Sequence, residues 1–242
     1  MDPAEVMLHY HNRALPQLDA LSFADPVTTV YNPLQYAHRS WEQYLRTYGA
    51  SPKEVLFLGM NPGPWGMAQT GIPFGEVSMV RSWLQIDAPI DRPSIEHPKR
   101  PILGWDCTRS EVSGQRLWNL FAEEFGTAEQ FFQRHLVINY CPLVFMAETG
   151  RNIAPDKLPK REREPLFEIC DALLQVAIDA YRPRVVVGVG AFARLRLEQS
   201  RGATLPHAPR VVQVLHPSPA SPAANRGWAP QARAQLQEAG VW

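Results

Sequence analysis

The stretch VLFLGMNPGPWG, residues 55–66, decides the fold more than any other part of the chain. It begins with a near-continuous apolar run, Val55–Met60, without the alternation of a strand that has one face in water. Such runs are typical of strands buried on both faces of a parallel sheet. The run ends at Asn61-Pro62-Gly63-Pro64, where proline and glycine favour a turn. The pattern predicts a buried strand followed by a stiff loop.

Three more runs of the same kind follow along the chain: Leu136–Asn139, Arg184–Val189 and Val211–Leu215. Segments with helical periodicity alternate with these runs, namely Gln35–Tyr48, Ser113–Phe125, Ala128–Gln133, Arg161–Tyr181, Ala191–Glu198 and Trp228–Glu238. This alternation predicts an α/β fold in which helices cover both faces of a parallel sheet. We expect one domain over residues 1–242, with residues 1–24 as a loosely packed N-terminal extension.

Composition restricts the class of protein. Hydrophobic residues make up 45% of the 242 residues, enough for a sizeable core. Lys+Arg and Asp+Glu both total 24, which excludes a uniformly basic nucleic-acid binder but leaves room for a local basic patch. The 3 cysteines form no CxxC pair, so we expect no metal site, no cofactor and no disulfide framework.

The sequence also bears on location. The N-terminal residues contain no apolar stretch of signal-peptide length, and no run is long enough to span a bilayer. We therefore expect a soluble intracellular protein without a membrane partner. It would be associated with the nucleoid in the cytoplasm of a bacterium, or nuclear in a eukaryote.

Polar side chains follow three of the four predicted strands at their carboxyl ends. Asn61 follows the first run, Asn139 ends the second and His216 follows the fourth, and proline-rich loops come next in each case. In open parallel sheets, ligands bind beyond the carboxyl ends of the strands. We therefore expect these three side chains to share one site.

Each of the three also has a plainer interpretation. The Asn61 loop could be only a turn, Asn139 could tie two loops together, and His216 could be a core histidine. The functional interpretations are chemically specific. An amide at position 139 offers a donor and an acceptor that match the O4 and N3–H edge of uracil. An imidazole held by a rigid loop could donate a hydrogen bond to an anionic leaving group.

Two loops carry further candidates. Phe74 lies among glycines and a proline in residues 71–75, and is either core or a platform on which a flat ring stacks. The turn His97–Pro101 contains Lys99 and Arg100, which are either solvated or contact phosphates. No carboxylate stands at a strand end, so a hydrolase with paired carboxylates is hard to build.

These motifs together resemble the single-strand-selective monofunctional uracil-DNA glycosylases. The resemblance runs from about Tyr31 to about Trp228, and its blocks are Gly59–Val77, His97–Leu103, Ser110–Gly114, Asn139 with Cys141–Leu143, Gly150–Asn152 and His216–Pro219. It implies a three-layer α/β/α fold with a central four-stranded parallel sheet. It also implies removal of uracil and 5-hydroxymethyluracil from DNA in base excision repair, leaving an abasic site.

The resemblance further implies a role for each matched residue. Asn61 would hold the attacking water, Asn139 would recognise the uracil edge, and His216 would stabilise charge at uracil O2. Phe74 would stack on the base. The backbone around Met60 and Gly63 would line the pocket, and Gly63 and Met67 would shape the space beside uracil C5.

The implied partner is DNA, single- or double-stranded, bound by a monomer. Its contacts would be Lys99, Arg100, Ser218, Pro219, Ala220, Ser221 and Asn225. One position departs from the family pattern, since vertebrate relatives place an arginine after the HPSP motif, where this chain has Ala220. None of the 4 lysines lies in a matched catalytic motif, so we expect no Schiff base and no strand cleavage. The alternatives are a mismatch-specific uracil/thymine glycosylase and a non-catalytic sensor of damaged DNA.

Overall fold

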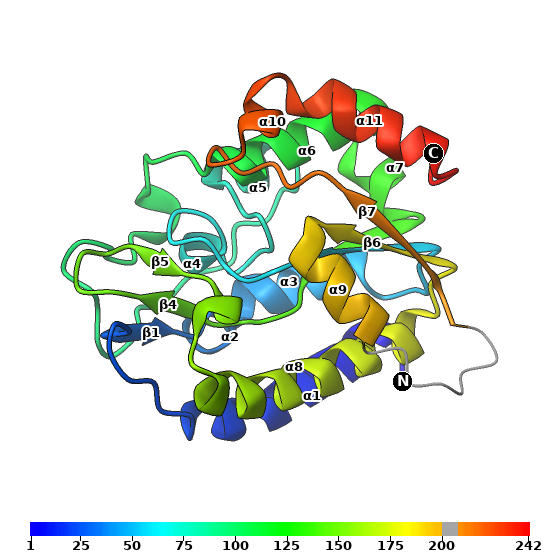
Figure 1. The fold of residues 1–242 in the computed structure, drawn as a ribbon. Coiled ribbons are helices and arrows are strands. Elements are labelled where there is room, and N and C mark those ends of the chain that lie inside the picture. Colours follow the sequence, from blue (N-terminus) through cyan, green and yellow to red (C-terminus); the bar gives the residue numbers. More distant parts are fainter. Residues whose placement is uncertain (200–207) are drawn as a thin grey trace.

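A four-stranded parallel sheet runs through the centre of the computed structural model, which describes residues 1–199 and 208–242 (Figure 1). Its strands are β2 (Val55–Gly59), β3 (His135–Asn139), β6 (Val185–Val189) and β7 (Arg210–Val214), in the order β3-β2-β6-β7. All four predicted strands and their parallel arrangement are confirmed, with ends that shift by about one residue. The apolar runs identified them because β2 and β6 are buried at every position.

The parallel register brings the strand ends together. Gly59 at the end of β2 is paired with Asn139 at the end of β3. At the other side of the sheet, Val189 at the end of β6 is paired with Val214 at the end of β7. The loops that follow β2, β3 and β7 therefore leave the sheet at the same edge.

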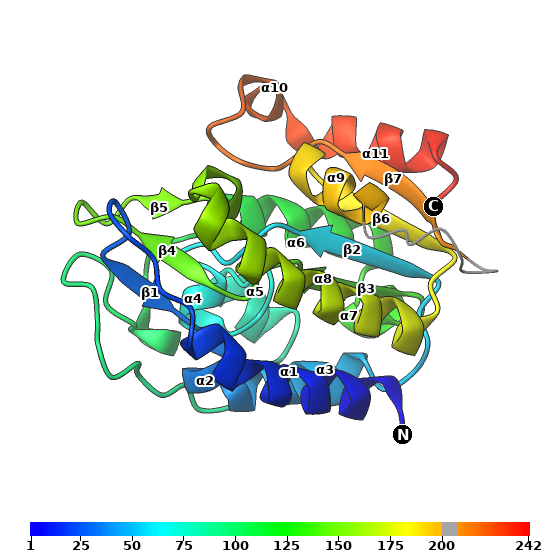
Figure 2. The ribbon, with the colours of Figure 1, turned by 60° about the horizontal axis from the view of Figure 1, so that its bottom comes forward.

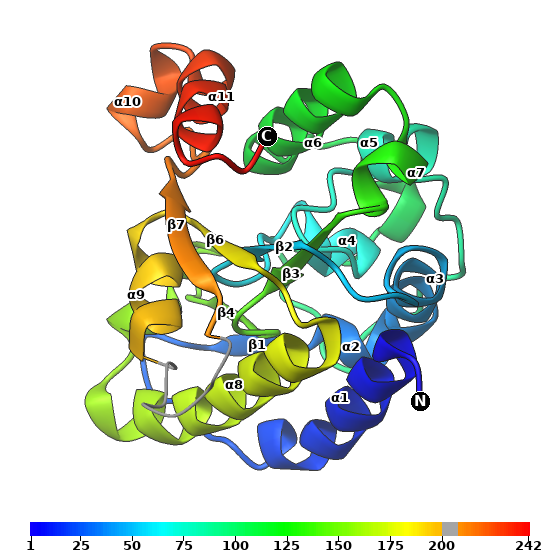
Figure 3. The ribbon, with the colours of Figure 1, turned by 90° about the vertical axis from the view of Figure 1, so that its right-hand side faces the viewer.

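Helices cover both faces of the sheet, as Figure 3 shows in side view. On one face lie α1 (Pro3–Asp19), α3 (His38–Tyr48) and α8 (Lys160–Tyr181), and on the other α6 (Val112–Phe125) and α11 (Trp228–Glu238). Two more helices, α7 (Ala128–Phe132) and α9 (Ala191–Gln199), also match the predicted segments. The predicted segment 35–48 differs, because it divides into α2 (Pro33–Tyr36) and α3.

The expectation of a loosely packed N-terminal extension is wrong. Helix α1 lies side by side with α8 (Figure 2), and its residues Ala4, Met7 and Leu18 are at most 3% exposed. Asp2 caps the helix by accepting a hydrogen bond from the Glu5 backbone N–H at 3.0 Å. The helix buries an apolar stripe in the main core and is therefore an integral part of the domain.

A second, antiparallel sheet was not predicted. It consists of β1 (Thr29–Tyr31), β4 (Val144–Met146) and β5 (Asn152–Ile153), in the order β1-β4-β5. Strands of two or three residues are too short to give a periodic pattern. The same holds for the short helices α4 (Met67–Thr70), α5 (Val77–Ser82) and α10 (Pro222–Asn225), and for the 3-10 turns η1 (Gly104–Asp106) and η2 (Pro155–Lys157). Among the described residues, no helix is both long and apolar enough to cross a membrane.

Candidate active site

Asn61 lies two residues beyond the end of β2, in a half-buried position. Its Nδ2 donates a hydrogen bond to the Leu143 carbonyl oxygen at 3.1 Å, which fixes the side chain against the loop that follows β3. The other branch of the amide, Oδ1, can accept a hydrogen bond from a water. Because an amide has no titratable group near neutral pH, Asn61 can orient that water but cannot take its proton.

Asn139 and Phe74 approach each other across Gly59. A Cβ added to Gly59 would lie 2.2 Å from Asn139 Oδ1 and 2.6 Å from Phe74 Cε2. Any larger residue at the end of β2 would therefore separate the amide from the ring. Asn139 Nδ2 contacts Met67 Sδ at 3.2 Å, so the predicted pocket residue Met67 lies beside the predicted recognition residue.

Phe74 and His216 form a second pair at the same edge of the sheet. Their ring centroids are 6.2 Å apart, with the planes tilted by 44°. The backbone of Phe74 has φ +54, and the Trp118 indole Nε1–H donates to its carbonyl oxygen at 2.9 Å. Gly190, with φ +92, makes room for the imidazole, since a Cβ there would lie 3.0 Å from His216 Cβ.

His216 is held as a neutral hydrogen-bond donor. The Ser218 backbone N–H donates to its Nδ1 at 3.1 Å, so Nδ1 carries the lone pair and the ring proton sits on Nε2. Burial lowers the pKa of His216 from 6.5 to about 4. At neutral pH the imidazole can therefore donate from Nε2 to a developing anion without being charged itself.

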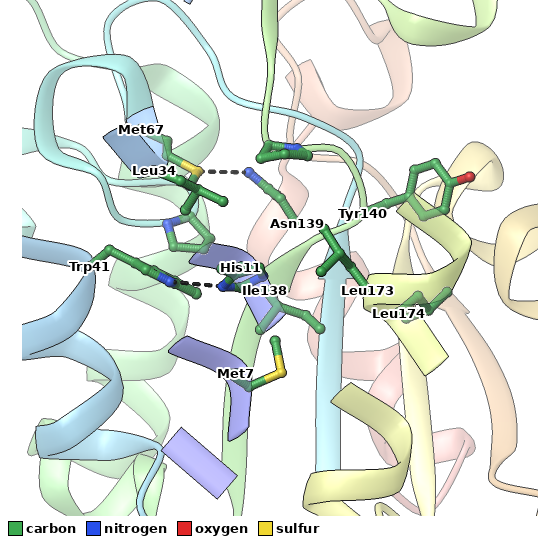
Figure 4. A pocket seen from close by; sticks show the side chains of 12 residues that line it. Met7, His11, Leu34, Trp41, Met67, Ile138, Asn139, Tyr140, Leu173 and Leu174 are labelled. Atoms are coloured by element: carbon green, nitrogen blue, oxygen red, sulfur yellow. Dashed lines mark hydrogen bonds between the residues drawn. The ribbon is translucent and has the colours of Figure 1, made fainter. Parts of the chain in front are cut away.

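Asn139 is one of the residues that line a small cavity (Figure 4). The cavity shares Met67 and Asn139 with the site and is also lined by His11 of α1 and Trp41 of α3. Burial lowers the pKa of His11 to about 4, and its Nδ1 accepts a hydrogen bond from Trp41 Nε1 at 3.0 Å. Asn61, Phe74 and His216 are not among the lining residues. The cavity therefore adjoins Asn139 but is not lined by the other three candidate residues.

The basic turn predicted at His97–Pro101 is tied to the Asn61 loop by a buried side chain. Gln69 Nε2 donates to the Pro64 carbonyl oxygen at 2.9 Å and to the Pro101 carbonyl oxygen at 3.1 Å. Its Oε1 accepts from the Leu103 and Gly104 backbone N–H groups. All the polar capacity of the amide is used, so the two loops are held in a fixed relation.

Two arginines face the indole of Trp65 in this region. The Arg100 and Arg109 guanidinium carbons lie 5.1 Å and 4.6 Å from the ring centroid. Lys99 is exposed on the same turn. Lys99 and Arg100 thus lie at the margin of the site and not beside Asn139 or His216. Arginine near an aromatic ring and an exposed lysine are suited to contact with a phosphate backbone.

The segment after His216 forms a compact exposed loop. Pro219 and Ala220 are exposed, the Ala220 N–H donates to Ser218 Oγ at 3.1 Å, and Ser221 caps α10. Asn225 Nδ2 donates to the Pro219 carbonyl oxygen at 2.8 Å. Of the predicted DNA contacts, Pro219 and Ala220 are therefore presented to solvent, whereas the Ser218 and Ser221 hydroxyls and the Asn225 amide make hydrogen bonds within the protein.

Two residues that organise the site, Arg116 and Glu111, were not predicted from the sequence. Arg116 on α6 donates to the Pro217 carbonyl oxygen and to Asn225 Oδ1, both at 3.0 Å. Glu111 caps α6 and lies against the Asn61 loop, although the acidic residues had no expected role. Two signals for Glu111 were available: its place just before a predicted helix, where acids act as caps, and its position in the matched block Ser110–Gly114. No cluster of three or more metal-ligating side chains occurs in the part of the chain that the structure describes.

The comparisons with known proteins identify the family of the chain. Residues 46–237 match the family model of the uracil DNA glycosylase superfamily. The chain is 48% identical over 238 residues to the single-strand selective monofunctional uracil DNA glycosylase of Mus musculus, covering 98% of this chain and 85% of that protein. The Bos taurus protein of the same name is 47% identical, with 98% and 87% covered.

A solved structure shows the fold independently of close sequence similarity. The crystal structure of wild-type Pedobacter heparinus SMUG2 superposes with a TM-score of 0.69 at 16% identity, and the match covers 100% of both chains. The family match spans most of the chain, and the two mammalian relatives cover nearly all of it. The chain therefore belongs to the uracil-DNA glycosylase superfamily and, within it, to the family of single-strand-selective monofunctional uracil-DNA glycosylases.

Proposed function

We propose that the protein is a monofunctional DNA glycosylase that hydrolyses the N-glycosidic bond of uracil in DNA and leaves an abasic site. The observation that carries this proposal is the meeting of a water-orienting amide, a base-recognising amide and a neutral imidazole at one sheet edge. Phe74 lies between the last two as a surface on which a flat base can stack.

The reaction follows from the roles of these side chains. The target nucleotide leaves the base stack, at a cost of a few kcal/mol that is smallest for an unpaired base. Cleavage of the glycosidic bond leaves an oxocarbenium-like sugar and a uracil anion. His216 Nε2–H stabilises the anion, and the water oriented by Asn61 adds to the sugar. The proton that the water loses balances the charge of the uracil anion, which leaves as neutral uracil. A dissociative path does not require a carboxylate base.

We expect single-stranded uracil DNA to be cut faster than uracil paired with adenine. Extraction from a duplex must break pairing as well as stacking. The exposed loop at Pro219 and Ala220 has no long side chain that could fill the gap left by the extruded nucleotide. Trp65 with Arg100 and Arg109 offers a contact for the backbone of either form of DNA.

The space beside uracil C5 favours small polar substituents. Gly63 has no side chain there, so a hydroxymethyl group can replace a water and keep its hydrogen bonds. A methyl group would leave the partners of that water unpaired, at roughly 1–3 kcal/mol. We therefore propose excision of uracil and 5-hydroxymethyluracil, with poor excision of thymine.

A Gly63→Tyr variant tests this steric account, with one constraint from the structure. The φ angle of Gly63 lies outside the left-handed region, so backbone strain does not forbid the change. A Cβ at this position would lie 3.3 Å from Glu111 Oε1, so the carboxyl must shift slightly. The expected result is a lower ratio of 5-hydroxymethyluracil to uracil excision in folded protein. An unchanged ratio would contradict the account.

The function itself is tested by incubating the protein with labelled oligonucleotides that contain one uracil, in single strands and opposite adenine or guanine. The expected product is an intact strand with an alkali-labile abasic site. Binding without base release would indicate a non-catalytic damage sensor. Removal of thymine from G·T pairs at the rate of uracil removal would indicate a mismatch-specific glycosylase.

A further inference from the structure

Glu111 lies at the start of α6, close to the loop that follows β2. Its Oε2 accepts a hydrogen bond from the Gly114 backbone N–H at 2.6 Å, which caps the helix. The residue is half-buried. A cap needs only the carboxylate oxygen, so the rest of the side chain is available for a second task.

The same side chain packs against the loop that carries Asn61. A Cβ added to Gly66 would lie 3.0 Å from Glu111 Cγ and 3.1 Å from its Oε2. At Gly63, the corresponding position is 3.3 Å from Oε1. The Glu111 side chain therefore occupies the space beside both ends of the turn 63–66, where side chains of other residues would stand. The turn begins two residues after Asn61, and Pro62 and Pro64 stiffen it.

The first turns of α6 also contact the backbone at Phe74 on the opposite side of the site, which we call the Phe74 wall. A Cβ on Gly114 would lie 2.0 Å from the Phe74 carbonyl oxygen, and Trp118 donates a hydrogen bond to that same oxygen. One short stretch of helix thus contacts the wall that holds Phe74 and, through Glu111, the loop that holds Asn61.

We propose that Glu111 is a positioning residue, whose side chain sets the distance between the Asn61 loop and the Phe74 wall and so places the attacking water relative to the base. The inference rests on the proposed glycosylase activity and adds a residue to it. Glu111 does not touch the base or the sugar in this account. It acts through the loop.

The charge of the carboxyl is not needed for this task. The pKa of Glu111 is raised to about 7, mainly by burial and also by the charge of Glu76, although hydrogen bonds from Gly114 and Ser113 oppose the shift. The neutral form is therefore populated near neutral pH. A glutamine, which has the same length and keeps an oxygen for Gly114 N–H, should replace it with little loss.

Three variants separate the cap from the contact with the loop. Glu111→Gln keeps both, Glu111→Asp keeps a good N-cap but withdraws the side chain from the loop, and Glu111→Ala removes both. Thr127→Ala is the matched control, because Thr127 caps α7 through Gln130 N–H at 3.3 Å and is exposed, outside the candidate site. Each variant is compared with the wild type for single-turnover rate on uracil-containing single strands, dissociation constant and melting temperature.

The proposal predicts that rate and stability separate. Glu111→Asp and Glu111→Ala should lose about tenfold or more in single-turnover rate, with dissociation constants within about threefold of the wild type. Glu111→Gln should stay within about threefold in rate. The melting temperature of Glu111→Asp should match the wild type, whereas Glu111→Ala and Thr127→Ala should melt lower. A wild-type rate for Glu111→Asp, or rates that follow melting temperature across all four variants, would overturn the positioning role. A wild-type protein without uracil release would instead refute the glycosylase function.

Discussion

The candidate site has two halves, one formed by Asn61 and Asn139 and the other by His216. The strands that precede these halves differ strongly in burial. Asn61 and Asn139 lie at the ends of β2 and β3, whose residues are buried apart from the half-exposed Asn139 itself. His216 follows β7, an edge strand on which only Val214 is buried. The half proposed to recognise the base therefore belongs to the sheet, whereas the half proposed to stabilise the anion lies at its margin.

The difference extends to what holds each half. Strand pairing in the Gly59–Asn139 register fixes the first half, together with the hydrogen bond that Asn61 Nδ2 donates to the Leu143 carbonyl oxygen. Side chains from helices fix the second half. Arg116 binds the Pro217 carbonyl oxygen, and Trp228 Nε1 donates to the Leu215 carbonyl oxygen at 2.6 Å. We therefore expect that a mutation in a helix can displace the His216 half and leave the sheet intact.

The largest expected effect is the loss of the imidazole. His216→Leu should lower the single-turnover rate about 10²–10³-fold, the usual scale for one anion-stabilising donor. The dissociation constant for uracil-containing DNA should change by less than about threefold, because the Asn139 half is untouched. Rate measurements under excess enzyme check the first value and fluorescence anisotropy the second. An intact rate with weakened binding would show that His216 only positions DNA.

The next effect concerns the other half. Asn139→Asp cannot donate from position 139 and loses the contact with Met67 Sδ. Uracil release should fall about 10- to 100-fold, consistent with roughly 1.5–3 kcal/mol for a hydrogen bond that involves a charged group. Release of cytosine should become measurable, because its N4 amine needs an acceptor. Normal uracil release by this variant would remove Asn139 from the recognition role.

A smaller effect is expected from the support of the His216 loop. Arg116→Met keeps the aliphatic stem but loses both hydrogen bonds to the 217–225 segment. The single-turnover rate should fall by about tenfold, since a small misplacement of a catalytic group is costly. The ratio of 5-hydroxymethyluracil to uracil release should stay the same. Arg81→Met, at an exposed arginine on α5, is the control and should behave as wild type. If Arg116→Met alters the ratio instead, the two halves are coupled.

The smallest expected effect is that of pH on His216. With its pKa lowered to about 4 by burial, the imidazole is neutral above that value and gains a proton only as pH falls towards it. In a Glu111→Gln background, which removes the carboxyl that titrates near 7, the rate should vary less than about twofold between about pH 6 and 8. It should decline as pH approaches 4. A rate that rises as pH drops through about 6.5 would mean that the imidazolium is the active form.

The sequence by itself determined the sheet and the three side chains at its edge. Each buried strand is a local apolar run, and each of Asn61, Asn139 and His216 directly ends or follows such a run. The carboxyl ends of parallel strands lie at the same edge of a sheet. Predicting that these residues meet therefore required only the number and the direction of the strands. The resemblance to a known family added roles to the same residues, and the comparisons confirmed the family.

Only the tertiary structure decided what supports the site. Arg116 and Asn225 are 109 residues apart in the chain, and Glu111 meets Gly63 and Gly66 across two loops. No periodicity encodes such contacts, because they depend on how α6 packs against the sheet edge. The burial of α1 against α8 has the same origin, since an amphipathic helix near a terminus shows an apolar stripe but not its partner. Local patterns fix elements and their ends, whereas packing between distant elements fixes the neighbours that hold each side chain of the candidate site.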